Sequence, residues 1–230
     1  MAHDEEPETR KVCKDLPTKF ESTFSEIIEA LRGMTAEDGS SLYQVHWDIC
    51  NTHEHGLPHH RERVYIVGLL ASDVVSPFSF PVTTSNIVPM GSILSDVAEC
   101  AGQRMAPTAA KNILLALAYI EANGGAAESE EWIVNTGGVS SHCMKGMCPC
   151  ITKHRGGGRA FYSTKRQRFL TIPEMMMLQG VDPSTFPQWE LHISRPKMGA
   201  IVGNSMSLNV MERIVRHLLH SLGYPVSLPS

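Results

Sequence analysis

The sequence predicts an α/β fold, and three segments near its beginning carry that prediction. Apolar residues at helical spacing predict an amphipathic helix over residues 20–32. Alternating apolar and polar residues predict a half-buried strand over residues 42–50. Residues 63–70 are almost continuously apolar, which is typical of a strand buried on both faces. These elements would form one edge of an α/β sheet.

The later part of the chain predicts three more helices separated by loops and short strands. The first covers residues 107–123, with a proline near its start and two glycines at its end. The second covers 171–179, where Thr171 and Glu174 have the spacing of a capping box. The third covers 206–222. The residues expected to face inward in the first and third are Ile113, Leu114, Leu117, Ile120, Leu208, Met211, Ile214, Val215 and Leu218.

Charge is distributed unevenly along the 230 residues, although the net charge is only −4. Residues 1–40 hold ten acidic and five basic side chains, whereas residues 145–168 hold seven Lys or Arg and no Asp or Glu. This asymmetry predicts a local anion-binding face. The N-terminus is acidic and lacks an apolar signal region, no apolar run reaches membrane-spanning length, and the six cysteines are irregularly spaced. We therefore expect an intracellular protein, nuclear if its source is eukaryotic.

The most informative motif runs from Gly56 to Gly68, where an Arg61-x-Arg63 pair leads into the apolar run. Alternate residues of an extended chain project together, and two guanidinium groups suit a phosphate or a base carbonyl. Salt bridges to nearby carboxylates are the simpler interpretation of an isolated Arg-Glu-Arg. The whole segment, however, resembles the eighth motif of DNA (cytosine-5) methyltransferases, with His59 where that family usually has Gln. The resemblance implies that Arg61 and Arg63 contact a flipped cytosine and a phosphate, with His59 as a further DNA contact.

Two more segments resemble later motifs of the same family, in the family's order. Residues 168–180 resemble the ninth motif, which is structural and helps to organise target recognition. Residues 203–210 resemble the tenth motif, and this resemblance implies that Asn204 and Ser205 contact S-adenosylmethionine. Helix capping is the simpler interpretation of a Gly-Asn-Ser turn. Here we expect the turn to open the last helix.

The segment between the eighth and ninth motifs lies where the family places its variable target-recognition domain. Within it, residues 148–159 resemble the family's Pro-x-x-Thr stretch and basic glycine loop. We expect Lys153, Arg155 and Arg159 to contact DNA, with the three glycines between them allowing a close approach to the phosphate backbone. A solvated surface loop is the alternative.

The sequence also lacks several motifs that the family's chemistry requires. We find no Phe-x-Gly-x-Gly cofactor loop, no Glu-Asn-Val, and no Pro-Cys nucleophile ahead of the eighth motif. Cys150 follows that motif and is not the nucleophile. The cysteines and histidine near residue 145 have no common zinc spacing, so we expect no metal. The chain thus resembles the C-terminal portion of the family.

The resemblance implies a partial Rossmann-like, S-adenosylmethionine-dependent methyltransferase fold with a small, irregular target-recognition lobe. We expect residues 1–70 to belong to the α/β sheet, 71–168 to form the target-recognition region, and 169–230 to return to the core. We also expect an incomplete cofactor pocket and no methyl transfer by the isolated chain. A second chain would supply the N-terminal catalytic half, or the sequence would be a truncated part of a longer enzyme. An exposed sheet edge and apolar face would follow. A catalytically inactive DNA-binding or regulatory relative, or a non-functional remnant, are the alternatives.

Overall fold

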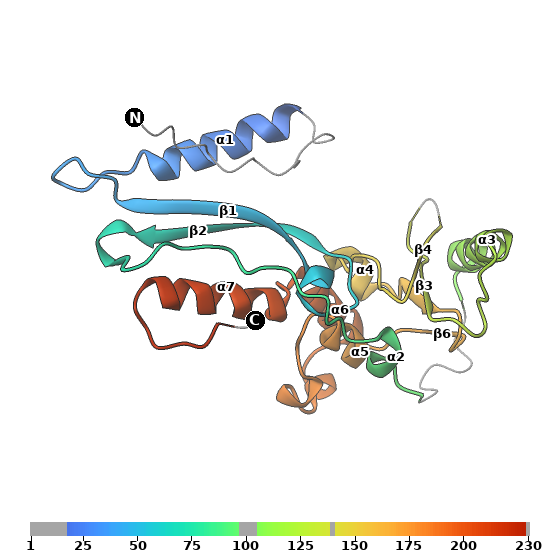
Figure 1. The fold of residues 1–230 in the computed structure, drawn as a ribbon. Helices are drawn as coiled ribbons and strands as arrows, with labels where there is room; N and C mark the ends of the chain where they lie inside the picture. The colour runs from blue at the N-terminus through green and yellow to red at the C-terminus, as the bar shows by residue number, and fades with distance from the viewer. Residues whose placement is uncertain (1–17, 97–104, 139–140, 229–230) are drawn as a thin grey trace. The chain divides into compact units, whose positions relative to one another are not determined.

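The computed structural model describes residues 18–96, 105–138 and 141–228 (Figure 1). The contacts group the chain into two compact units: residues 1–49, 63–80 and 216–230 form the first, and residues 50–62 and 81–215 form the second. The predicted functional division at residues 70 and 168 stays a prediction. The helices and strands are α1 (Thr18–Arg32), β1 (Tyr43–Asn51), β2 (Glu62–Leu70), α2 (Met90–Ile93), α3 (Pro107–Ala122), β3 (Trp132–Asn135), β4 (His142–Lys145), α4 (Lys153–Gly157), β5 (Phe161–Ser163), β6 (Arg168–Phe169), α5 (Ile172–Met177), α6 (Arg195–Asn204) and α7 (Leu208–Ser221).

The first unit contains the helix and the two strands predicted near the beginning of the chain. β1 pairs with β2 in a two-stranded sheet. α1 lies beside β1 (Figure 1), where the rings of Phe24 and Trp47 meet edge to face with centroids 4.9 Å apart. Such an arrangement is favourable because the positive edge of one ring meets the negative face of the other. The predicted order of helix, strand, loop and strand is therefore confirmed.

The burial of β2 differs from the prediction of a strand buried on both faces. Its side chains alternate, with Tyr65, Val67 and Leu69 buried. On the other face Val64 and Ile66 are 39% and 40% exposed. The apolar run predicted a strand with two covered faces, but the described residues cover only one of them. An apolar face of this sheet is thus partly exposed among the described residues.

The helices predicted over residues 107–123 and 206–222 are present as α3 and α7. Ile113 and Ile120 are buried as expected, whereas Leu114 is 68% exposed because Asn112 and Ala116 take the inward positions of α3. In α7, Ile214 is buried, but Leu208 and Val215 are exposed. The spacing of apolar residues therefore predicted both helices correctly. It was wrong about some of the side chains expected to face inward. No helix among the described residues is long and apolar enough to cross a membrane.

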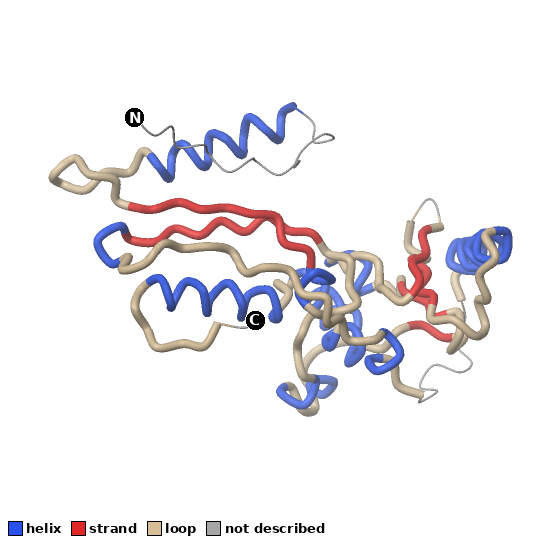
Figure 2. The backbone as a smooth tube through the Cα atoms, viewed as in Figure 1, coloured by secondary structure: helices blue, strands red, loops and turns tan. Residues whose placement is uncertain are grey.

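The second unit is built on a four-stranded antiparallel sheet in the order β4-β3-β5-β6. Figure 2 shows the strands in red and the helices in blue. Helix α5 follows β6 directly. Thr171 caps α5 with the predicted capping box, because its side chain accepts from the Glu174 N–H while the Glu174 carboxylate accepts from the Thr171 N–H at 2.8 Å. The core of this unit consists of apolar residues from the sheet, α5, α6 and the loop before α4, including Ile133, Ile151, Phe161, Met176, Leu178, Met198 and Val202.

Candidate nucleic-acid interface

The segment around His59 meets residues 148–151 and the end of α5 within the second unit. His59 and Cys148 form a parallel β-bridge. The His59 ring is fully buried; its Nε2 accepts from the Ile151 N–H at 3.1 Å, and its Nδ1 lies 3.1 Å from the Leu178 carbonyl oxygen. Because a carbonyl only accepts, Nδ1 carries the proton and the ring is neutral. This burial favours a structural role for His59 over the predicted DNA contact.

Arg61 is also buried, and its guanidinium group donates to backbone carbonyls from two distant segments. Nη1 donates to the Ile151 carbonyl at 2.5 Å and, more weakly, to the Gly203 carbonyl at 3.4 Å. Nη2 donates to the Ser205 carbonyl at 2.7 Å. Arg61 therefore fixes the turn at residues 203–205 to the segment before α4.

Arg63 has a different environment from Arg61. It lies on β2 in the first unit, where its side chain is exposed. The two arginines were predicted to act together on a flipped base and a phosphate. In the structure Arg63 is exposed, whereas Arg61 is buried among carbonyls.

The turn at residues 203–205 ends α6 rather than opening the last helix. Asn204 is the last residue of α6 and Ser205 is its C-cap, so the prediction that they cap the last helix is wrong, although α7 begins within the motif at Leu208. Gln179 nevertheless forms hydrogen bonds to residues on either side of this turn. The Gln179 side chain donates to the Val202 carbonyl at 3.0 Å and accepts from the Ser207 hydroxyl, also at 3.0 Å.

Asn204 and Ser205 have the donors and acceptors that the amino-acid end of S-adenosylmethionine needs. The Asn204 side chain is exposed and makes no hydrogen bond to another described residue. Its amide offers N–H groups for a carboxylate and an oxygen for an ammonium group. Ser205 is half-buried, and its hydroxyl donates to the Val202 carbonyl at 2.7 Å. The turn therefore fits a cofactor contact through Asn204, with Ser205 holding the turn in shape.

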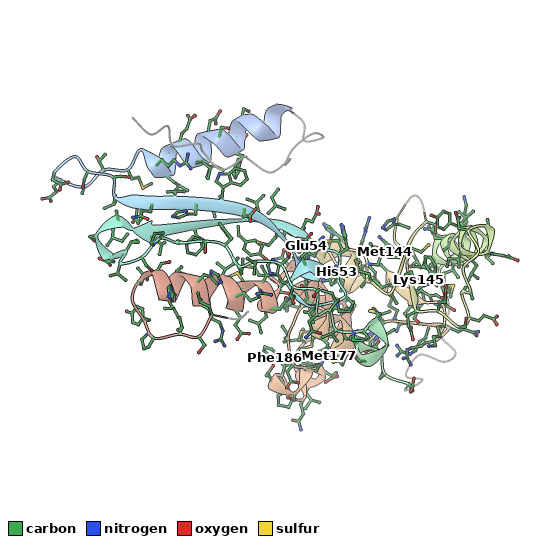
Figure 3. All side chains as sticks on the ribbon, in the orientation of Figure 1. His53, Glu54, Met144, Lys145, Met177 and Phe186 are labelled. Carbon is green, nitrogen blue, oxygen red and sulfur yellow. The ribbon has the colours of Figure 1, made fainter. Side chains whose placement is uncertain are left out.

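The basic segment at residues 145–168 divides into paired and unpaired cations. Four of its seven Lys and Arg side chains form ion pairs with carboxylates. Lys145, labelled in Figure 3, lies 2.5 Å from Glu130. The other three are Lys165, Arg166 and Arg168, which pair with Glu131, Asp96 or Glu174.

The three remaining cations are Lys153, Arg155 and Arg159, the residues that the sequence predicted to contact DNA. Their side chains form no ion pair or hydrogen bond with any residue that the structure describes. Lys153 and Arg155 lie on α4, and Arg159 follows it with a left-handed backbone at φ 49°. Non-glycine residues adopt this conformation infrequently, and it often marks a functional position. The structure thus leaves these three positive charges uncompensated at one place in the fold.

The glycines of this loop have a packing role that differs from the predicted one. A Cβ atom added at Gly156 would lie 2.1 Å from the Gly199 carbonyl oxygen, and one at Gly157 would lie 2.8 Å from the Pro196 carbonyl oxygen. Side chains at these positions would therefore collide with the backbone of α6. Gly156 and Gly157 allow α4 to approach α6, and the close approach of this loop to a phosphate backbone stays a prediction.

Two cavities lie beside this loop, and Arg159 lines both. One, of about 240 Å³, also contacts Arg195 and the buried side chain of Phe161. The other, of about 410 Å³, is lined by residues at the start of α3 and by Thr136 after β3. The side chain of Asn112 shapes that second wall, because it donates to the carbonyls of Thr136 and Gly138 at 3.0 and 2.9 Å.

Two cysteines of this region are shielded from solvent. Burial raises the pKa of the Cys148 thiol well above its usual value and also raises the pKa of the Cys143 thiol. Among the described residues, no group of three His, Cys, Asp or Glu side chains is placed to hold a metal ion.

Sequence reasoning missed Arg195 and Gln179. Arg195 lies outside every motif, and the only signal for it was the lack of Asp and Glu in α6, which leaves its cations without a local partner. Gln179 lies inside the ninth motif, but its bonds to Val202 and Ser207 join residues 23 and 28 positions away, which local spacing does not reveal.

Comparison with known proteins agrees with these features. The family model of C-5 cytosine-specific DNA methylases matches residues 15–220. The Type II methyltransferase M.NgoBI of Neisseria gonorrhoeae is 30% identical over 192 residues, which cover 83% of this chain and 53% of the relative. M.HaeII of Haemophilus aegyptius is 28% identical over 78% of this chain and 52% of its own length. The chain thus spans about half the length of these relatives.

A solved structure supports the fold. The methyltransferase EhMeth of Entamoeba histolytica superimposes with a TM-score of 0.51 at 12% identity, covering 88% of this chain and 58% of that one. Together with the mixed helices and sheets, this likeness confirms the predicted α/β fold of S-adenosylmethionine-dependent methyltransferases. Since the family model covers most of its length, the chain belongs to the C-5 cytosine-specific DNA methylase family.

Proposed function

We propose that this chain provides the DNA target-recognition and base-binding part of a DNA (cytosine-5) methyltransferase. The observation that carries the proposal is the separation of the basic segment into paired and unpaired cations. Lys153, Arg155 and Arg159 are the three without carboxylate partners. Uncompensated cations on a short helix and the following loop suit the DNA backbone, because neutralising phosphates releases condensed counterions.

Family membership supplies the substrates of the proposed reaction. The methyl group would come from S-adenosylmethionine, with Asn204 holding the amino-acid end of the cofactor. The acceptor would be C5 of a cytosine turned out of the duplex. Arg63, which is exposed, would contact that base or its phosphate. Arg61 would hold the turn at residues 203–205 in place through its bonds to the carbonyls of Gly203 and Ser205.

Methyl transfer would need residues that these 230 positions do not contain. A thiolate must add to C6 of the cytosine to activate C5, and no Pro-Cys precedes the Arg61-x-Arg63 segment. We propose that a segment equivalent to the other half of the relatives' length, in the same polypeptide or on a second chain, supplies the nucleophile and the main cofactor loop. The exposed face of β2 is a surface that such a segment could cover.

A mobility-shift titration with matched double substitutions tests DNA binding. Arg155→Gln with Arg159→Gln removes two unpaired charges, and Lys145→Gln with Lys165→Gln removes two paired charges from the same segment. We expect the first pair to weaken binding at least tenfold and to reduce the salt dependence by about two phosphate contacts, whereas the second pair should bind nearly as the parent does. Equal behaviour of the two double variants would exclude this interface.

A methyl-transfer assay tests whether the nucleophile and the main cofactor loop come from another segment. The purified chain should not transfer a labelled methyl group to cytosine-containing DNA. Adding a polypeptide that carries a Phe-x-Gly-x-Gly loop and a Pro-Cys segment, identified by co-purification, should restore transfer. Turnover by the chain alone would overturn the proposed division. Retained DNA binding without any complementing polypeptide would instead favour a DNA-binding relative without catalysis.

A further inference from the structure

The packing of α4 against α6 brings two further cations toward the predicted DNA-binding loop. Gly156 and Gly157 remove the side chains that would keep the helices apart, and their would-be Cβ atoms meet the backbone of Gly199 and Pro196. Pro196 stands between Arg195 and Lys197 at the start of α6. The side chains of Arg195 and Lys197 form no ion pair or hydrogen bond with any part of the chain that the structure describes.

The cavity of about 240 Å³ lies at this junction and combines two kinds of lining. Four buried apolar side chains line it, each at most 3% exposed: Phe161, Leu170, Ile172 and Met175. Arg159 and Arg195 line it as well, and both are half-buried. The cations therefore lie nearer the solvent than the apolar lining does.

This combination fits a nucleotide better than it fits an isolated anion. A free phosphate in the cavity would lose hydration against four apolar side chains and gain nothing from them. A nucleobase has two apolar faces that suit such a lining, and its attached phosphate is an anion that a pair of guanidinium groups can bind. The volume exceeds that of several water molecules, which occupy about 30 Å³ each in the liquid.

We propose that this cavity is a subsite for an unstacked DNA nucleotide, with the base against Phe161, Leu170, Ile172 and Met175 and its phosphate held by Arg159 and Arg195. The proposal rests on the proposed DNA-binding function and makes Arg195 a contributor to target recognition. Lys197, two residues further along α6, does not line the cavity. We expect Lys197 to contact a phosphate whichever base is present.

An abasic scan of a bound duplex tests the subsite without altering the protein's fold. Each position of a short cytosine-containing duplex is replaced in turn by an abasic nucleotide, and the Kd for the parent chain is measured. We expect one position at which removal of the base weakens binding by about tenfold, the size of one lost base-stacking contact. At that same position, Arg195→Gln should produce a markedly smaller additional loss than it produces with the intact duplex.

Lys197→Gln provides the matched control on the same helix. It should weaken binding by a similar factor at every position of the scan, because a phosphate contact does not depend on which base is present. Arg195→Lys keeps the positive charge but loses the planar guanidinium group. It should therefore restore only part of the dependence of binding on the base at the sensitive position.

The outcomes separate this inference from the function on which it rests. If Arg195→Gln behaves as Lys197→Gln does, or if no position in the scan is sensitive to Arg195, the nucleotide subsite is wrong while DNA binding stands. If the parent chain does not bind the duplex at all, the proposed function itself fails. A thermal melt of Arg195→Gln that matches the parent shows that the variant is folded, and a variant that melts early is replaced by Arg195→Lys in the comparison.

Discussion

At the scale of single residues, Arg61 and Arg63 show how two similar side chains in one motif take different roles. Arg61 donates to the carbonyls of Ile151 and Ser205 at 2.5 and 2.7 Å, inside the second unit. Arg63 is exposed on β2. Burial therefore assigns Arg61 to holding the turn after α6, whereas Arg63 lies at the surface, where we propose that it contacts DNA.

Substituting each arginine with glutamine separates these roles. Arg61→Gln should lower the free energy of unfolding by about 3 kcal/mol, because a hydrogen bond from a charged donor contributes about 1.5–3 kcal/mol and buried carbonyls are left unpaired. Arg63→Gln should change stability by less than about 0.5 kcal/mol, as exposed substitutions usually do, and should weaken DNA binding. Urea denaturation and a DNA titration measure both. Comparable destabilisation by the two variants would contradict the assignment.

His59 offers a second test at this scale, because the family usually has glutamine there. A neutral histidine and a glutamine both provide one donor and one acceptor, so His59→Gln can keep the bonds to Leu178 and Ile151. We expect His59→Gln to stay within about 1 kcal/mol of the parent, and His59→Leu to lose about 1–3 kcal/mol through unpaired backbone groups. The measurement is urea denaturation at pH 7. A more stable His59→Leu would show that packing alone determines this position.

At the scale of elements, the contact between α4 and α6 is the most demanding feature of the fold. A Cβ atom at Gly156 would lie 2.1 Å from the Gly199 carbonyl oxygen, and one at Gly203 would lie 2.2 Å from the Thr152 carbonyl oxygen. The backbones of the two helices are therefore in direct contact. This contact determines where Lys153 and Arg155 lie relative to Arg195.

Alanine at two neighbouring glycines tests that contact. Gly156→Ala should lower the free energy of unfolding by at least about 1–3 kcal/mol, the cost of overpacking, and should weaken DNA binding as α4 shifts. Gly158→Ala is the matched control, since its Cβ would meet nothing closer than 3.4 Å and its φ of −104° suits any residue. If the two variants melt at the same temperature, the close approach of α4 and α6 is not required for the fold.

Helix α5 depends on an ionised Glu174, which gives stability a particular pH dependence. Burial raises the pKa of Glu174, but hydrogen bonds from Arg168, Thr171 and Ser95 outweigh burial and hold that pKa below its usual value near 4.5. Because the folded state has the lower pKa, the contribution of Glu174 is fully present above pH 4.5. It is lost as the pH falls below 4.5 and through the folded-state pKa.

We therefore expect the free energy of unfolding to decrease as the pH falls below about 4.5, and Glu174→Gln to show a weaker decrease over the same range. At pH 7 Glu174→Gln should cost about 3–5 kcal/mol, because it leaves the buried Arg168 without its carboxylate. Urea denaturation at a series of pH values measures both effects. Identical pH profiles for parent and variant would exclude Glu174 as the titrating group.

At the scale of the whole molecule, local patterns predicted the elements, and contacts across long sequence separations determined the candidate site. Thr171 and Glu174 lie three residues apart, so their capping box could be predicted from spacing. Arg61 reaches Ile151 and Ser205 across 90 and 144 residues, and no periodicity records such a contact. For the same reason, spacing placed Leu114 on the inward face of α3 although it is 68% exposed.

The exposed face of β2 leads to a prediction for the whole chain. Val64→Thr with Ile66→Thr keeps the β-branched side chains that strands favour and makes this face more polar. We expect the double variant to remain monomeric at higher concentration than the parent, with an unchanged melting temperature, and to lose complementation by a catalytic polypeptide. Light scattering and the methyl-transfer assay measure these effects. Full complementation by the double variant would show that the catalytic half docks elsewhere.

The backbone contact between α4 and α6 also bears on the engineering of DNA specificity. A designer who wishes to change the recognised sequence would naturally exchange the loop at residues 153–159 alone. Because Gly156 and Gly157 fit against the backbone of α6, a loop from another protein would match only a helix shaped for it. The exchangeable module is therefore the loop together with α6. Since α6 ends in the turn at residues 203–205, every such exchange would also change the turn that we propose contacts the methyl donor.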